Sequence, residues 1–149
     1  MAEEHIPPTQ VKSIGKRHTQ QRQAILEYLL NTTEHPSADQ IYRHLRERFA
    51  SLSLATVYNN LELLVSSGQI TAIGDIGDHK ERFDGNTTDH INLVCSVCHK
   101  ITDLPFEQFE TIDEQIQEQS DFLITGSRIL YFGVCPECQI EQKSSSTNE

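Results

Sequence analysis

The sequence predicts an α+β protein built from two small units, the first mainly helical and the second a mixture of strands and helix. Apolar residues recur at helical spacing three times before residue 70, whereas β-prone runs and period-two alternation dominate after it. The charge changes at the same place. Seven basic and seven acidic residues precede position 71, and five basic and fifteen acidic residues follow it. The net charge of -10 therefore comes from the second unit and does not exclude nucleic-acid binding by the first.

Two helices are predicted after an N-terminal arm, residues 1–15, that lacks periodicity and is expected to be flexible. Thr19 suits the N-cap of the first helix, which then continues with helical apolar spacing to about Asn31. The second helix covers roughly residues 37–49, because a capping box of the S-x-x-Q type opens it and apolar residues follow on one face.

A third helix begins after Ser53, which suits an N-cap, and ends near Gly68. Its apolar stripe predicts one buried face, while small and hydrogen-bonding side chains occupy the other faces of its first two turns. Contact with DNA base edges requires such side chains at the start of a helix. The candidates for this contact are Thr56, Tyr58, Asn59 and Asn60.

A β-hairpin is predicted next, from two short β-prone runs at residues 70–73 and 80–84 around a segment with two glycines. Three helices followed by a hairpin is the order of a winged-helix DNA-binding domain, here over residues 16–84. Three basic residues where the arm meets the first helix are candidates for phosphate contact: Lys16, Arg17 and Arg22. For the arginines of the second helix, a solvated face explains the pattern equally well.

The second unit is predicted to follow a hinge at residues 85–89 and to cover residues 90–140 as a small α/β domain. Within it, HINLV and ITDL favour strands, FEQFETIDEQIQE has the spacing of a helix, and SRILYFGV favours a further strand. The polar tail, residues 141–149, is expected to be disordered.

The four cysteines form two Cys-x-x-Cys pairs, and they are the strongest chemical signal in the chain. Each spacing lets a tight turn direct two sulfurs at one point, so the two pairs predict a tetrahedral structural zinc site. The ligands would be Cys95, Cys98, Cys135 and Cys138. The alternative is a redox pair, but that motif normally opens a helix after a strand and works alone.

The expected compartment supports metal binding by these cysteines. The first residues, MAEEHIPPTQ, lack the basic and apolar regions of a secretory signal, and no apolar run approaches the roughly 18 residues of a membrane helix. We therefore expect a cytoplasmic protein without membrane contact, in which thiols stay reduced unless a metal or catalysis engages them.

A second set of ligand candidates lies near the predicted junctions between elements. Taken singly, each is better explained as a cap, a turn former or a solvated polar group than as a ligand, and spacing alone does not assemble a site. On a strand, His90 and Asn92 would project to the same side. The set is His35, Asp84, His90, Asn92 and Asp103.

The motifs GKRHTQQRQAILEYL, HPSADQIYRHL, SLATVYNNLELL, RFD, DHINLVCSVC and YFGVCPEC resemble the ferric uptake regulator (Fur) family, and within it the peroxide-sensing branch. The resemblance runs from about residue 15 to 139 and implies a winged-helix domain followed by a dimerisation domain. It implies that the four cysteines hold structural zinc and that the third helix, with Tyr58 and Asn60, reads DNA.

The same resemblance implies a regulatory metal site with one departure. His35, Asp84, His90 and Asp103 match four of the five ligands in the peroxide-sensing branch, whereas Asn92 replaces a histidine. An amide oxygen is a weaker ligand than imidazole toward Fe²⁺ or Mn²⁺, so affinity or selectivity is expected to change. Gly126, Ser127 and Arg128 stand where many members carry histidines for an additional site, so one regulatory site is expected.

Asp84 at its position implies, in that branch, an iron centre that reacts with hydrogen peroxide, with His35 and His90 as the oxidised residues. The resulting hypothesis is a homodimeric, metal-dependent repressor that binds double-stranded operator DNA and takes no other small molecule as a signal. Asn92 motivates an alternative, an iron- or zinc-responsive uptake regulator. A thiol oxidoreductase using the cysteine pairs is a third hypothesis, and the winged-helix unit argues against it.

Overall fold

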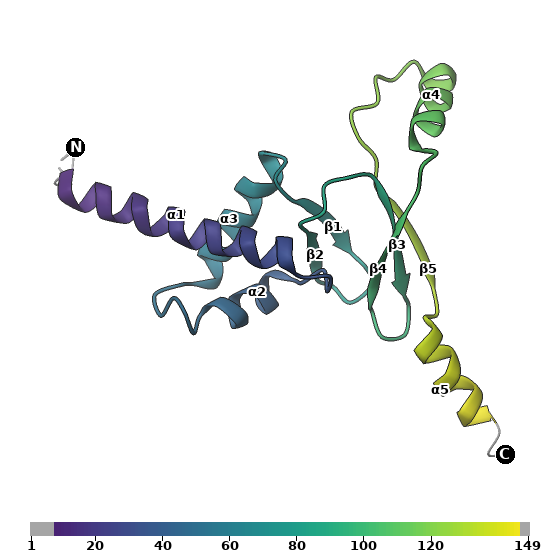
Figure 1. Cartoon of the computed structure of the whole chain (residues 1–149), viewed down its shortest axis with the longest axis horizontal. Helices are drawn as coiled ribbons and strands as arrows, with labels where there is room; N and C mark the ends of the chain where they lie inside the picture. The colour runs from purple at the N-terminus through teal and green to yellow at the C-terminus, as the bar shows by residue number, and fades with distance from the viewer. Residues whose placement is uncertain (1–7, 147–149) are drawn as a thin grey trace.

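A computed structural model describes residues 8–146, and of residues 8–18 it describes only the helical backbone. The helices and strands up to residue 133 follow one another as predicted, whereas the helix after them was not predicted. The helical half lies on one side and the three-stranded sheet on the other (Figure 1). The elements are α1 (Pro8–Asn31), α2 (Ala38–Leu45), α3 (Leu54–Ser66), β1 (Thr71–Asp75), β2 (Glu81–Asp84), β3 (His90–Cys95), β4 (Ile101–Pro105), α4 (Phe109–Ser120), β5 (Ile129–Gly133) and α5 (Pro136–Ser146).

The first helix is longer than the sequence predicted. α1 begins at Pro8, so residues 8–15 are helical instead of part of a flexible arm, and Thr19 lies inside the helix instead of capping it. Proline at the first helical position has a suitable φ and lacks only an amide hydrogen that would be unpaired there in any case. Residues 1–7 lie outside the described part of the chain.

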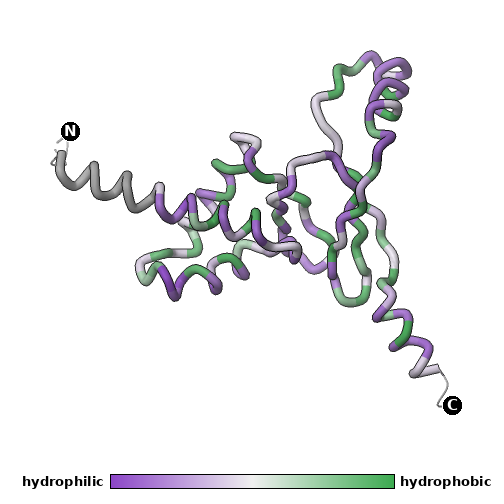
Figure 2. Tube along the Cα trace, in the orientation of Figure 1, coloured by the Kyte–Doolittle hydropathy of each residue, from purple (hydrophilic) through white to green (hydrophobic). Residues whose placement is uncertain are grey.

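The core of the N-terminal half forms where α1, α2 and α3 pack together. Ser37 caps α2 with the predicted capping box, and the side chain of Ser53 accepts from the amide of Thr56 at the start of α3. The apolar stripes of the three helices meet in one buried cluster. Figure 2 shows hydrophobic and hydrophilic residues following one another along the helical half. The side chains of Ile25, Ile41 and Val57 are completely buried there.

The predicted hairpin is present as the antiparallel pair β1 and β2, with a bulge between Ala72 and Gly74. It does not project freely. Ile73 and Ile76 of the hairpin are buried against Val94 and Ile101 of the second unit. The wing therefore joins the two halves of the molecule.

The second unit is built on a three-stranded sheet of order β4-β3-β5, in which β3 pairs antiparallel with β4 and parallel with β5. The connection between β4 and β5 contains α4, which extends away from the sheet, as α5 does in another direction (Figure 1). One face of the sheet packs against the wing, and the other face remains largely exposed. The predicted α+β class is confirmed.

The C-terminal tail is also more ordered than predicted. α5 continues to Ser146, so residues 141–146 are helical, whereas 147–149 lie outside the described part. Pro136 opens the helix, Glu137 and Lys143 suit its dipole, and the hydroxyls of Ser144 and Ser145 donate to carbonyls one turn earlier. Composition alone missed these local interactions.

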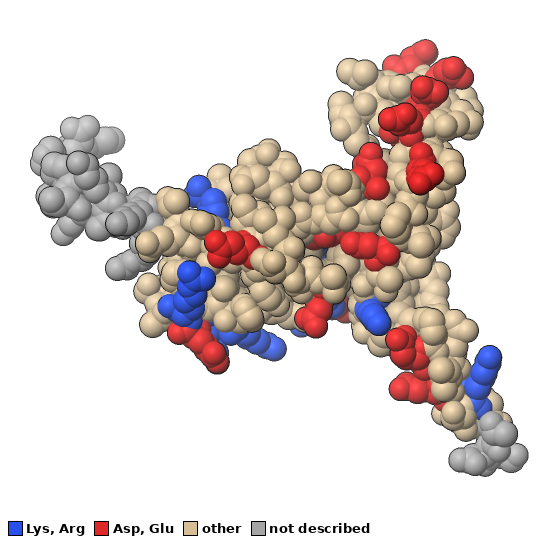
Figure 3. Space-filling view, viewed as in Figure 1, with Lys and Arg blue, Asp and Glu red and all other residues tan. Residues whose placement is uncertain are grey.

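The charge distribution follows the division between the two halves. In the face shown in Figure 3, acidic side chains gather over α4, whereas basic side chains lie mainly over the helical half. Over residues 8–146, no helix combines the length and the apolar character that crossing a membrane requires.

Candidate metal centres and DNA-reading surface

The four cysteines lie together where the end of β3 meets the start of α5. One ligand atom from each lies within 4.8 Å of all the others, and the sulfurs of Cys98 and Cys135 are 3.8 Å apart. A tetrahedral zinc ion with Zn–S bonds of about 2.3 Å requires sulfurs about 3.8 Å apart, whereas a disulfide requires about 2.05 Å. The spacing therefore fits a metal site and not a disulfide.

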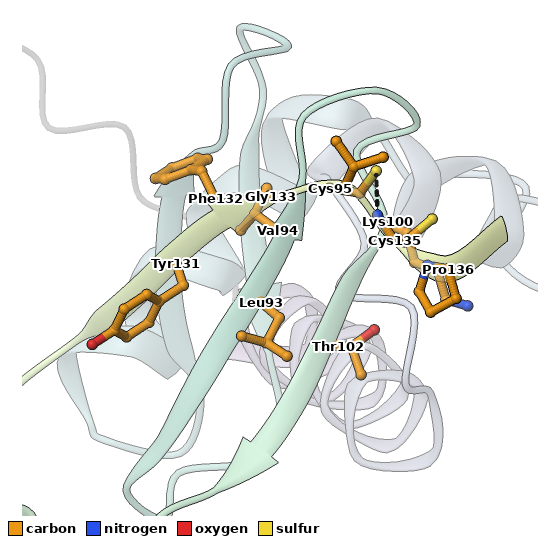
Figure 4. Close-up of a pocket in the computed structure, with 11 residues that line it drawn as sticks. Leu93, Val94, Cys95, Lys100, Thr102, Tyr131, Phe132, Gly133, Cys135 and Pro136 are labelled. Carbon is orange, nitrogen blue, oxygen red and sulfur yellow. Dashed lines mark hydrogen bonds between the residues drawn. The ribbon is translucent and has the colours of Figure 1, made fainter. Parts of the chain in front are cut away.

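Backbone amides direct this cluster toward thiolate chemistry. Hydrogen bonds from the amides of Cys98 and Cys135 lower the pKa of Cys95 to about 6, and the second of these contacts is drawn in Figure 4. The neighbouring Cys135 thiol, by contrast, raises the pKa of Cys138. Four crowded sulfurs cannot all ionise without a compensating cation, and a dication supplies that charge. The donor set thus fits zinc.

A second cluster forms where the N-terminal half meets the sheet. His35 follows α1, Asp84 ends β2, His90 begins β3 and Asp103 lies in β4, and their ligand atoms lie within 4.8 Å of one another. The Nε2 atom of His35 is 2.7 Å from Oδ1 of Asp103, and that of His90 is 3.0 Å from Oδ2 of Asp84. Two imidazoles and two carboxylates, contributed by both units, therefore converge on one point.

The electrostatics of this second cluster favour the ionised form of Asp84. Burial alone would raise the pKa of Asp84, but the hydrogen bond and charge of His35, an amide hydrogen bond from Asn86 and the charge of His90 hold it below its usual value. Burial likewise works to lower the pKa of His35, but Asp84 and Asp103 raise it above its usual value. The raised pKa of His35 shows that the two carboxylates favour positive charge at this point, which is the charge a metal ion would supply.

A contact on the far side of its ring orients His90 toward the cluster. Its Nδ1 atom is 2.6 Å from the carbonyl oxygen of Thr88, an arrangement that leaves Nε2 directed at the cluster. Metal-bound histidines commonly donate their other ring nitrogen to a backbone carbonyl in this way. Because Thr88 contributes only its backbone, no side-chain motif could have revealed its part.

Asn92 lies beside the four clustered residues. It pairs across the ladder with Asp103 and follows His90 by two positions, so the three side chains share one face of the sheet. Asn92 is 4% exposed, and its Oδ1 atom has no hydrogen-bond partner among the described residues. A buried acceptor without a donor fits a ligand position better than a purely structural one. A polar hollow of about 40 Å³ adjoins it, and Asp84, His90, Asn92 and Arg128 are among the residues that line this hollow.

The predicted DNA-contacting residues are divided by the structure into exposed and buried groups. Tyr58 and Asn59 are exposed on α3, and Thr56 is half-buried. Asn60 is buried, with its Oδ1 accepting from Nε of Arg22 at 3.0 Å and its Nδ2 donating to the carbonyl of Thr56 at 2.9 Å. The hydrogen bond between Arg22 and Asn60 therefore links α1 to α3, and the side chain of Asn60 is not available to base edges. The side chains of Lys16 and Arg17 lie outside the described part.

Sequence reasoning missed an exposed apolar surface on the sheet. Leu93, Leu104, Tyr131 and Phe132 remain 38%, 45%, 59% and 61% exposed. Leu93 and Tyr131 are register partners, and with Thr102 they line a hollow of about 390 Å³ beside the cysteine cluster (Figure 4). The alternation in SRILYFGV could have indicated a second apolar face.

A winged-helix DNA-reading unit joined to a unit with two candidate metal centres is the architecture of a metal-responsive transcription regulator. Residues 13–132 match the model of the ferric uptake regulator family, and the chain belongs to that family. The resemblance seen in the sequence motifs is thereby confirmed. Regulators of this family bind DNA as dimers, and family membership identifies a transcriptional regulator and not an enzyme.

Known relatives agree with this placement. The peroxide-responsive repressor PerR of Staphylococcus epidermidis (strain ATCC 12228 / FDA PCI 1200) is 39% identical over 131 residues, which cover 88% of this chain and 87% of that protein. PerR of Staphylococcus aureus (strain USA300) is 41% identical over 129 residues, covering 87% and 86%. The chain is thus similar to PerR proteins over most of its length.

Solved structures agree as well. The Campylobacter jejuni peroxide stress regulator superposes with a TM-score of 0.78 at 28% identity, over 89% of this chain and all of that one. The Helicobacter pylori ferric uptake regulator superposes with a TM-score of 0.70 over 86% of this chain and 88% of that one, and at 22% identity it supports the fold alone.

Proposed function

We propose that this protein is a cytoplasmic, homodimeric repressor that binds operator DNA when a divalent metal ion is bound between its two units. The four cysteines hold structural zinc. Fe²⁺ or Mn²⁺ occupies the regulatory centre formed by His35, Asp84, His90, Asn92 and Asp103. The observation that carries the proposal is the convergence within 4.8 Å of four ligand atoms contributed by both units.

Control of the angle between the units follows from the origin of the ligands. His35 and Asp84 belong to the winged-helix domain, and His90 and Asp103 to the domain that begins after the hinge at residues 85–89. A bound dication would offset the charge of both carboxylates. Because it binds the closed arrangement of the two units more tightly than an open one, it favours the closed arrangement. Loss of any ligand releases the winged helix to other angles, at which two recognition helices no longer match successive turns of the major groove.

The proposed signal is hydrogen peroxide. Fe²⁺ held by these residues would supply the chemistry that activates peroxide, and the imidazole of His35 or His90 would accept one oxygen atom while the other leaves as water. An oxidised imidazole is a poorer ligand, so the site opens and DNA is released. Asp84, which is ionised in this environment, supports the assignment because it stabilises the charged centre.

Dimer formation is supported by the apolar groups that the single chain leaves uncovered. α4 stands away from the sheet, Phe122 and Leu123 after it are 71% and 84% exposed, and one face of the sheet is apolar. A partner subunit would bury these groups, since monomeric proteins rarely leave large apolar surfaces in water.

Operator binding provides the test. Anaerobically purified protein should carry two metal equivalents per subunit, one of them removable by a mild chelator. A duplex selected from a random library by the Mn²⁺-loaded protein should bind with Mn²⁺ or Fe²⁺ and dissociate after peroxide treatment of the Fe²⁺ form. His35→Ala should abolish metal-dependent binding. His79→Ala should not, because the side chain of His79 is 96% exposed and lies on the wing loop.

An iron- or zinc-responsive uptake regulator is the second candidate, and Asn92 is the observation that favours it. An amide in place of imidazole changes the field at the metal and could prevent iron from reacting with peroxide. Under this alternative, DNA binding depends on one particular metal and survives peroxide, and mass spectrometry finds His35 and His90 unmodified.

A further inference from the structure

The backbone around His35 has an unusual conformation that must be held in place. His35 has φ 51°, in the left-handed region that a residue with a side chain rarely adopts unless its surroundings hold it there. Its neighbours extend the wing: the amide of Phe83 donates to the carbonyl of Pro36 at 3.1 Å, and Ser37 forms an isolated bridge with Arg82. Strand β2, which also carries Asp84, thus fixes the segment that presents His35.

Arg82 adds a side-chain contact to this backbone pairing. Its Nη1 atom donates to the carbonyl oxygen of His35 at 3.5 Å, and its Nη2 atom donates to the carboxylate of Asp78. The side chains of Arg82 and Asp78 are only 11% and 16% exposed. A planar guanidinium with one nitrogen on a carboxylate holds its other donors in the same plane, which the single ammonium of a flexible lysine does not do.

Asp78, in turn, is held by the docking of the wing loop on the sheet. Its Oδ1 atom accepts from the amide of Lys80 at 3.2 Å, and Ile76, two positions earlier, is 2% exposed within the cluster formed with Val94 and Ile101. A continuous set of contacts therefore runs from the second unit through the wing loop and Arg82 to the backbone of His35.

We propose that Arg82 is a positioning residue for the regulatory metal centre and that Asp78 acts through it. The pair transmits the docking of the wing loop to the carbonyl of His35 and so holds the imidazole in the direction required for ligation. This inference rests on the proposed function, because it assigns a role toward the metal bound there. Neither Arg82 nor Asp78 is itself a metal ligand in this proposal.

Mn²⁺ titration of the full-length, zinc-retaining protein tests the proposal. Arg82→Gln and Asp78→Asn should each weaken Mn²⁺ binding by roughly 10-fold, the lower end of the loss caused by removing outer-shell partners. The double variant should be no weaker than the weaker single variant, because the two residues act as one unit. Arg82→Lys should not restore affinity. Arg43→Gln, at an exposed arginine on α2, should bind like the parent.

A spectroscopic measurement separates positioning from general destabilisation. With Co²⁺ at the regulatory centre, the visible spectrum of Arg82→Gln should move toward that of His35→Ala, since the imidazole is no longer held for ligation. Asp78→Asn provides the same test if Arg82→Gln does not fold. Parental affinity in both variants, additive losses, or weaker binding with a parental spectrum would each overturn the proposal. If Mn²⁺ binding does not depend on His35 at all, the proposed function falls and this inference falls with it.

Discussion

Replacing Gly85 with alanine should disturb the regulatory centre from the side of the helical core. Gly85 follows the ligand Asp84 and is buried against the end of α1. A Cβ atom at this position would lie 2.5 Å from the carbonyl oxygen of Leu29, 2.7 Å from its carbonyl carbon and 2.9 Å from the amide nitrogen of Leu30. All three are backbone atoms, so no side chain can rotate away to make room.

The size of the effect follows from this geometry. The contact must open from 2.5 Å to at least the 3.4 Å of ordinary van der Waals contact, so either α1 or the segment carrying Asp84 has to move. Overpacking of this kind costs about 1–3 kcal/mol. For a chain of this size, that corresponds to a fall in Tm of roughly 2–12 °C. Displacement of Asp84 should also weaken Mn²⁺ binding by about 10-fold.

Thermal unfolding of the metal-free protein, followed by circular dichroism, and Mn²⁺ titration are the two assays. Gly126→Ala is the matched control, because a Cβ at Gly126 has no atom within 4 Å. It should unfold and bind metal like the parent. Equal unfolding temperatures for the two variants would refute the reasoning, since the close approach at Gly85 would then carry no energetic consequence.

Three further changes separate the roles of the remaining site residues. Cys98→Ser should abolish stoichiometric zinc content, because a hydroxyl is a poor zinc ligand and the sulfur of Cys98 lies 3.8 Å from that of Cys135; full zinc content by atomic spectrometry would exclude the four-sulfur site. Asn92→Ala should weaken Mn²⁺ binding and Asn92→His should strengthen it, because imidazole is the better donor; calorimetric titrations that match the parent for both would show that the amide is not a ligand. Asn60→Ala should lower the free energy of unfolding, measured in urea, by about 1–3 kcal/mol, since it leaves Arg22 without its buried acceptor. Asn59→Ala, at an exposed position on the same helix, should change this free energy by at most about 0.5 kcal/mol. A smaller loss for Asn60→Ala than for Asn59→Ala would contradict the structural role.

Local signals in the sequence predicted the elements accurately where short-range interactions define them. The capping box at Ser37 and the N-cap at Ser53 depend on residues within one turn, and both are present. Proline at the start of α1 and α5 is an equally local signal, but the composition of residues 1–15 and 141–149 predicts flexible segments there. The helix ends therefore differed where composition and capping chemistry pointed in opposite directions.

The role of Asn60 shows why a side chain's neighbours on other elements could not be predicted. Its position early in α3 suits base contact, yet Arg22 reaches it from α1, and the contact joins residues 38 positions apart. Helical periodicity describes which face a residue occupies but not which side chain of another helix will lie against that face. Tyr58 and Asn59 remain exposed on the same helix, and their contact with DNA stays a prediction.

By itself, the sequence determined the order of the elements up to the last strand, the unequal distribution of charge and the two Cys-x-x-Cys motifs. Hydrophobic period and cysteine spacing are properties of neighbouring residues. Only the tertiary structure decided that the wing docks on the sheet, that Arg82 reaches the backbone of His35, and that ligands from four separate segments meet within 4.8 Å. Those distances depend on how whole elements pack, and packing is set by the summed burial of side chains far apart along the chain.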